Sequence, residues 1–196
     1  MRAYLTYNQA IIMLYIYGVL LFSGTDPVSE LIKTVTASRY SHCALALRDD
    51  ATGKEYCFES TGSFHQLVWQ HIRPQVQVSS LSGAVDTYSG RVVIRKLRNV
   101  TKTDVTAYVR NLIGISYEQN MGELVNALQR TNNAANDTSL FCSELVAKTL
   151  MDNGYMPATR LANNYMPKDF SDKENISLAL RPEKVLRDDS CRCNVI

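Results

Sequence analysis

The spacing of hydrophobic and polar positions changes half way along the chain, from a strand period to a helix period. In the first half, short apolar runs of strand length are separated by turns that contain Asp, Gly and Pro. One amphipathic helix interrupts them: apolar residues recur at i, i+3, i+4 and i+7 from Val28 to Val35, after an N-cap at Asp26 and a proline at the first helical position. The predicted strands cover residues 19–22, 42–47, 55–60, 67–78 and 91–97.

The second half is mainly helical in its pattern. Three apolar faces at helical spacing are predicted there, over residues 105–113, 121–128 and 145–150. The order of strand, helix, several strands and then helices indicates an α+β protein. A length of 196 residues and an apolar fraction of 45% suit one domain with a real core. We assign residues 1–170 to this domain and residues 171–196 to a polar C-terminal tail.

Charge and cysteine usage exclude several classes of protein. The 21 basic and 19 acidic residues leave a net charge of +2, which gives no basic surface for nucleic acid. The five cysteines are odd in number and contain no C-x-x-C pair, so neither a disulfide framework nor a zinc site is indicated. His42, His65 and His71 share no ligand spacing, and we interpret the last two as surface or structural residues. No metal and no cofactor are expected.

The apolar run Ala10–Phe22 bears on where the protein acts. Its 13 residues are fewer than the roughly 18–20 that span a bilayer. Arg2 precedes it, so a signal peptide and a secreted protein form one alternative. Tyr15 and Tyr17 within the run, and the lack of an A-x-A cleavage site after it, count against that alternative. The run also fits a buried helix end followed by a buried strand, and we favour an intracellular protein.

Cys142, His42 and Glu59 are the candidate catalytic residues. Cys142 begins the third predicted helix, with Ser139 or Thr138 as its cap, and a helix N-terminus favours a thiolate and can bind an oxyanion. His42 opens a strand and can act as base, while Glu59 lies in the next strand of a predicted hairpin and can orient the imidazole. Each residue taken singly also fits a structural role.

Together, these residues resemble a known family. The ordered segments are Gly18–Gly24, Tyr40–Ala46, Phe58–Gly62, Gly114–Glu118 and Phe141–Val146. They are similar to the circularly permuted papain-like cysteine hydrolases of the NlpC superfamily, which include the YiiX/YaeF-type amidases and a related poxviral protein. The resemblance covers about residues 16–155, with the histidine before the cysteine. It departs from the family at Val19, where an Asp usually follows the glycine.

The resemblance implies a permuted papain-like fold, an antiparallel sheet or barrel packed against helices. It implies Cys142 as nucleophile, His42 as general base, Glu59 as the residue that orients it, and Tyr117 near the oxyanion pocket. The expected activity is that of an amidase, peptidase or acyl-ester or thioester hydrolase that forms an acyl-enzyme. An acyltransferase and a non-catalytic module that binds an acyl chain or a peptide are the alternatives.

The chain end carries a separate signal. Cys193-Asn-Val-Ile196 fits the C-a-a-X sequence of prenylation, and Cys191 can take a palmitoyl chain as the second anchor that stable membrane binding requires. A disordered tail that happens to end this way is the alternative. If the tail is lipidated, the protein binds a cytoplasmic membrane face peripherally. Its substrate is then a lipidated protein, a lipid amide or ester, or a membrane peptide.

Overall fold

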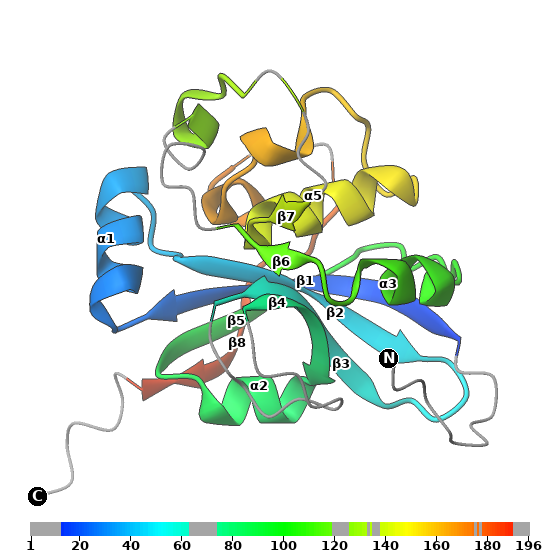
Figure 1. Ribbon diagram of the computed structural model, residues 1–196. Coiled ribbons are helices and arrows are strands. Elements are labelled where there is room, and N and C mark those ends of the chain that lie inside the picture. The colour runs from blue at the N-terminus through cyan, green and yellow to red at the C-terminus, as the bar shows by residue number, and fades with distance from the viewer. Residues whose placement is uncertain are drawn as a thin grey trace, which may run out of the picture.

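A computed structural model describes residues 13–62, 74–118, 126–132, 134, 138–174, 176 and 178–189. These residues form an α+β fold around one eight-stranded sheet, with strand order β7-β6-β4-β3-β2-β1-β5-β8 (Figure 1). The strands are β1 (Leu14–Gly24), β2 (His42–Asp49), β3 (Glu55–Thr61), β4 (Gln75–Ser80), β5 (Gly90–Lys96), β6 (Ser116–Tyr117), β7 (Ser139–Leu140) and β8 (Lys184–Asp188). The helices are α1 (Pro27–Thr36), α2 (Leu81–Thr87), α3 (Thr106–Leu112), α5 (Cys142–Asp152), and the 3₁₀ turns η1 (Ala162–Asn164) and η2 (Pro167–Phe170).

Strand β1 is an interior strand of the sheet, between antiparallel β2 and β5. Both of its faces are buried, because α3 and α5 cover one side of the sheet and α2 covers the other (Figure 1). A strand buried on both faces has no polar alternation, which explains the continuous apolar run in the sequence. Gly18 is required here, since a Cβ at that position would lie 2.8 Å from the carbonyl oxygen of Arg95.

The run Ala10–Phe22 is therefore part of the domain from Leu14 onward. The expected helix end is wrong for residues 14–18, which belong to the strand, and residues 10–12 lie outside the described part. Cleavage after Phe22 would remove most of β1, the strand that lies between β2 and β5. Among the described residues, no helix is long and apolar enough to cross a membrane.

The sheet departs from the expected pattern in one respect. The strand pairs are antiparallel except for β6 and β7, which are parallel, so the sheet is mixed and not antiparallel throughout. The predicted β2–β3 hairpin is confirmed, with Leu45 opposite Phe58. The predicted strand 67–78 is observed over Gln75–Ser80, and residues 67–73 lie outside the described part. The second predicted helix, 121–128, lies largely outside it as well.

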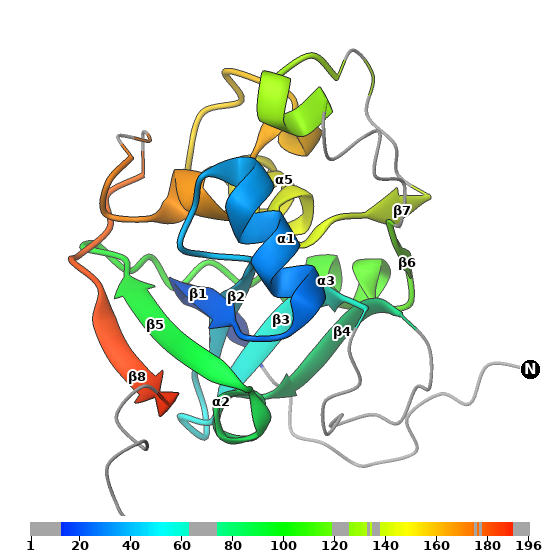
Figure 2. The same ribbon diagram turned by 90° about the vertical axis from the view of Figure 1, so that its left-hand side faces the viewer.

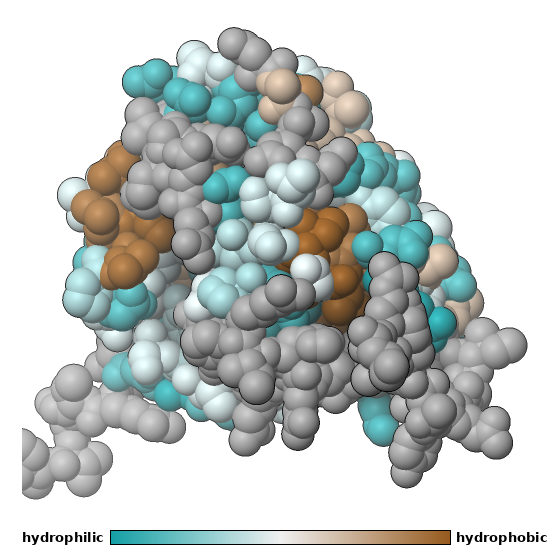
Figure 3. Space-filling model, in the orientation of Figure 1, coloured by the Kyte–Doolittle hydropathy of each residue, from teal (hydrophilic) through white to brown (hydrophobic). Residues whose placement is uncertain are grey.

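Helix α1 begins as predicted, but most of its apolar stripe is exposed and does not face the core. The Asp26 carboxylate accepts the Ser29 N–H at 3.0 Å, and Pro27 takes the first helical position. An amphipathic helix normally turns its apolar stripe to the core. Here Val28, Leu31 and Val35 are 65%, 53% and 42% exposed. Figure 3 shows a hydrophobic patch on the left of the molecule, where α1 lies in Figure 1.

Residues 171–196 are assigned from the sequence to a polar tail, but the described part of this segment packs against the domain. Leu178 and Leu180 are buried, and β8 pairs with β5 at the sheet edge. The Glu183 carboxylate binds Arg39 at 2.8 Å and accepts the Tyr40 hydroxyl at 2.6 Å. These contacts join residues that are far apart in the sequence, so polar composition alone did not reveal them. Cys191 and Cys193 lie outside the described residues.

Candidate active site

The N-terminus of α5 meets the ends of β2 and β3, and this junction brings the predicted catalytic residues together. His42 is the first residue of β2 and pairs with Phe22 of β1, while Cys142 is the first residue of α5. Helix α5 crosses the sheet face opposite to α2, with its N-terminus at this junction (Figures 1 and 2). The caps proposed for α5 are wrong: its N-cap is Phe141, whose N–H is accepted by the Glu144 carboxylate.

Cys142 lies in an environment that favours its thiolate. The Cys43 thiol donates a hydrogen bond to it, and this bond, the charge and hydrogen bond of His42, and the Cys43 backbone N–H hold the pKa of Cys142 well below its ordinary value against the effect of burial. Cys43 itself keeps its proton, because burial and the neighbouring Cys142 raise its pKa. The first-turn N–H groups of a helix add a positive potential at the same place.

His42 bridges the thiol and a buried carboxylate. Its Nε2 lies 2.8 Å from Glu59 Oε2, which leaves Nδ1 as the ring nitrogen for the hydrogen bond with Cys142. Burial opposes the charged ring, but the charge and hydrogen bond of Cys142, together with Glu59, raise the pKa of His42 to about 10. The two shifts together describe a thiolate–imidazolium pair over the neutral pH range. Cys142 is 7% exposed and the His42 side chain 15%, so both side chains are largely covered by the protein.

Glu59 is held in turn by Gln77. Glu59 and Gln77 are directly opposite each other in the β3–β4 pairing, and the Gln77 amide donates to Glu59 Oε1 at 3.0 Å. Both side chains are buried. The carboxylate is thus fixed on one oxygen by an amide and on the other by the imidazole. Sequence reasoning missed Gln77, although the alternation Gln75-Val-Gln-Val78 was a signal that one face of this strand is polar.

Two tyrosines border the thiol. Tyr117 of β6 packs edge-on against Phe141 at 6.2 Å, and burial followed by the charge of Cys142 raises its pKa. Tyr88 was not predicted: burial, followed by the charges of Asp26 and Cys142, raises its pKa to about 12, while hydrogen bonds with Ser41 and Ser29 act in the opposite direction. Its ring packs on Phe22 at 4.9 Å, and Phe22 packs on the His42 ring at 5.1 Å.

The geometry supports acyl transfer chemistry. A thiol, an imidazole and a carboxylate are in contact in that order, which is the arrangement that nucleophilic catalysis by a cysteine requires. The start of α5 lies at the same place, and the N-terminus of a helix is a group of N–H donors of the kind that can stabilise an oxyanion. In the described part of the chain, no group of three or more His, Cys, Asp or Glu side chains could hold a metal ion. His65 and His71 lie outside that part.

Comparison with solved structures places the chain in a fold class. The described architecture is a mixed-sheet α+β fold that recurs in solved structures, five chains of which match it. One is the crystal structure of the metalloprotein YiiX from Escherichia coli O157:H7, of the family DUF1105, with a TM-score of 0.53. The match covers 89% of this chain and 97% of YiiX, at 14% sequence identity, and therefore concerns the fold alone. Comparison of the sequence with protein-family models and with curated proteins found no match.

Proposed function

We propose that this protein is a thiol hydrolase of the circularly permuted papain-like type, with Cys142 as nucleophile, His42 as general base and acid, and Glu59 as the residue that orients the imidazole. The observation that carries the proposal is the unbroken series of contacts from Cys142 through His42 and Glu59 to Gln77. A merely structural cysteine is normally a buried thiol without a charged base beside it.

The reaction follows the acyl-enzyme scheme. The Cys142 thiolate attacks the carbonyl carbon of an amide, ester or thioester. The carbonyl oxygen becomes an oxyanion, which accepts hydrogen bonds from the N–H groups at the start of α5 and has Tyr117 beside it. The C–N, C–O or C–S bond then breaks, and the His42 imidazolium gives its proton to the leaving group. Water attacks the acyl-enzyme with neutral His42 as base, and Cys142 leaves as thiolate.

The order of the residues supports the permuted form of the fold. His42 and Glu59 come from strands β2 and β3, while the cysteine helix α5 follows 100 residues after His42, since 142 − 42 = 100. The likeness to YiiX supports this topology at the level of the fold. Peptides, lipidated proteins and lipid amides or esters are the proposed substrate class. If an alcohol or amine replaces water in the second step, the same site is an acyltransferase.

An iodoacetamide-type activity probe at pH 6 tests the proposal. We expect it to label Cys142 in the wild type, because a thiolate is alkylated far faster than a thiol. Labelling should be lost in Cys142→Ala and fall by at least about tenfold in His42→Ala, which removes the charge that lowers the pKa of Cys142. Cys57→Ala serves as the control, since Cys57 is also buried but contacts Ser79 and not Cys142. Equal labelling of wild type and His42→Ala would contradict the catalytic assignment and favour a binding module.

A further inference from the structure

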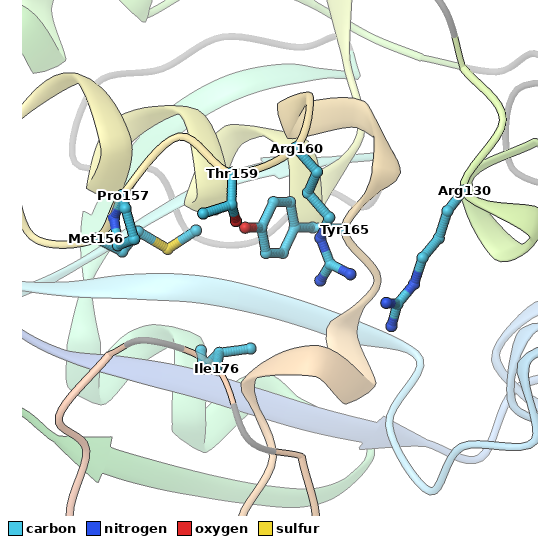
Figure 4. A pocket seen from close by; sticks show the side chains of 7 residues that line it. All are labelled: Arg130, Met156, Pro157, Thr159, Arg160, Tyr165 and Ile176. Carbon is cyan, nitrogen blue, oxygen red and sulfur yellow. The ribbon is translucent and has the colours of Figure 1, made fainter.

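A cavity of about 220 Å³ opens beyond the C-terminal end of α5 and shares no residue with the thiol site. Its apolar wall is formed by Met156 and Pro157, which follow α5, and by Ile176, which follows η2. Two arginines end at the opposite side of the same space, as Figure 4 shows. The site therefore combines positive charge with an apolar wall in one small cavity.

Arg160 is held rigidly at the edge of this cavity. Its guanidinium lies 3.7 Å from the centre of the Tyr165 ring, and that ring stacks on Phe170 at 5.9 Å. Stacking of this kind fixes the position of the planar guanidinium and leaves the N–H groups at its edge free to bind. Within the described part of the chain, the buried Nε of Arg160 has no hydrogen-bond partner. Because this Nε is covered by the protein, the donors that can face a ligand are the Nη groups of the guanidinium.

Arg130 reaches the same place from a different segment. Its Nη2 lies 3.3 Å from Asp169 Oδ1, while Nη2 of Arg160 lies 3.1 Å from Asp169 Oδ2. Asp169 is buried and also accepts the Met166 N–H at 2.8 Å, so it is a fixed point between the two arginines. Each arginine contacts one carboxylate oxygen and has five N–H groups, so further donors remain for a ligand.

The net charge of the cluster formed by Arg130, Arg160 and Asp169 determines which anions it can bind. Two arginines and one aspartate leave one net positive charge, which matches a monoanion. A phosphate dianion would carry a second negative charge close to the buried Asp169 and be repelled by it. The planar N–H pair of an arginine fits a carboxylate with two parallel hydrogen bonds. The apolar wall of Met156, Pro157 and Ile176 then suits a short hydrocarbon group attached to that carboxylate.

We propose that this cavity is a binding site for an organic carboxylate with a short apolar substituent, held by Arg160 and Arg130. The site stands apart from the proposed hydrolase chemistry, and binding does not require Cys142. The cavity is smaller than the roughly 300–1,000 Å³ of typical ligand pockets, which limits the ligand to a few carbon atoms beyond the carboxylate.

Titration calorimetry of the full chain with hexanoate tests the site. We expect saturable binding of hexanoate, no binding of 1-hexanol, which has the same carbon chain without the charge, and at least tenfold weaker binding of inorganic phosphate. Cys142→Ala should bind hexanoate like the wild type. Equal binding of hexanol, tighter binding of phosphate, or no binding of hexanoate up to its solubility limit would each overturn the proposal.

Variants separate the site from general surface charge. Arg160→Met keeps an unbranched apolar side chain but loses the guanidinium, and should weaken hexanoate binding at least tenfold. Arg130→Met should weaken it about threefold, because Arg130 is 56% exposed. Arg110→Met is the matched control, an exposed arginine on α3, and should change nothing.

The Arg160 variant also loses a partner of Asp169, so a second variant leaves that ion pair intact. Thr159→Trp places a large ring at an exposed position that lines the cavity. It should block hexanoate binding while the melting temperature stays close to that of the wild type. Hexanoate affinity that is unchanged in both Thr159→Trp and Arg160→Met would show that the ligand binds elsewhere.

Discussion

At the scale of single residues, two neighbours from β2 lower the pKa of Cys142. The Cys43 thiol has the largest effect on its pKa, and the imidazole of His42 adds a charge and a hydrogen bond. Cys43 can donate because its own pKa is raised by burial. Two adjacent residues at the start of β2, His42 and Cys43, thus act on one sulfur.

Removing the Cys43 thiol should raise the pKa of Cys142. In Cys43→Ala, the pH at which alkylation of Cys142 reaches half its maximal rate should move upward, because one hydrogen bond to the thiolate is lost. Cys57→Ala deletes an equally small buried side chain on the neighbouring strand and should leave this midpoint unchanged. Each variant should lower the free energy of unfolding by about 1 kcal/mol. Equal midpoints in Cys43→Ala and wild type would contradict the assigned hydrogen bond.

Glu59 should hold the proton on His42. The variant Glu59→Gln keeps the shape of the side chain but removes the negative charge, so the pKa of His42 should fall below about 10. The imidazolium then loses its proton at lower pH, and the alkaline limit of activity moves down with it. NMR titration of the His42 ring measures this directly, with only two other histidines in the spectrum. The hydrolytic rate should fall on the order of tenfold, less than in His42→Ala. An unchanged titration midpoint would show that Glu59 does not act on the ring.

These residues differ in how far the sequence could predict them. Cys142 and His42 could be proposed because each begins a recognisable element, and Glu59 because it lies in the second strand of a predicted hairpin. Gln77, Tyr88 and Cys43 could not, because their roles depend on strand register and on which side chains meet across the sheet. Register is fixed by the packing of the whole sheet rather than by local pattern.

At the scale of elements, α1 shows that an apolar stripe does not identify the buried face of a helix. Ile32 and the buried Thr36 face the domain, and Ile32 packs against the cluster of Ala127, Phe141 and Met166. Val28 and Leu31 lie outside it, on the exposed side. Periodicity therefore predicted the helix and its N-cap correctly, while the contact face was set by the neighbouring segments.

Paired substitutions on α1 test which face is packed. Leu31→Ser should change the free energy of unfolding by less than about 0.5 kcal/mol, because an exposed side chain loses little. Ile32→Ser should lower it by about 1–2 kcal/mol, since it removes buried apolar surface and places a hydroxyl against the cluster. Urea denaturation measures both. A larger loss for Leu31→Ser than for Ile32→Ser would show that the outer stripe is covered in solution.

At the scale of the whole molecule, the last described strand closes one edge of the sheet. Strand β8 pairs with β5, and Arg91 lies 3.4 Å from the Asp188 carboxylate. Glu183 adds contacts to Arg39 and Tyr40 from the segment that enters β2. The general α+β class could be predicted from the order of elements, but this return of the chain could not, because it rests on pairing between residues about 95 positions apart.

Truncation should show that β8 stabilises the domain. A chain ending at Arg181 loses β8 and Glu183, exposes the edge of β5, and should melt on the order of 10 °C lower than the full chain. A chain ending at Asp189 keeps the pairing and should melt like the full chain. Thermal unfolding followed by circular dichroism compares the two. Equal melting temperatures for the two truncated chains would mean that β8 contributes nothing to stability.

The separation of His42 and Cys142 in the chain also affects how the protein is made. While the polypeptide leaves the ribosome, the histidine strand emerges long before the cysteine helix, and until α5 docks on β2 the sulfur has neither the imidazole nor the Cys43 donor beside it. A newly made Cys142 is then an ordinary thiol with a pKa of about 8.5. The low pKa of Cys142 therefore exists only in the completed tertiary structure, which makes the alkylation rate of Cys142 a measure of the folded fraction.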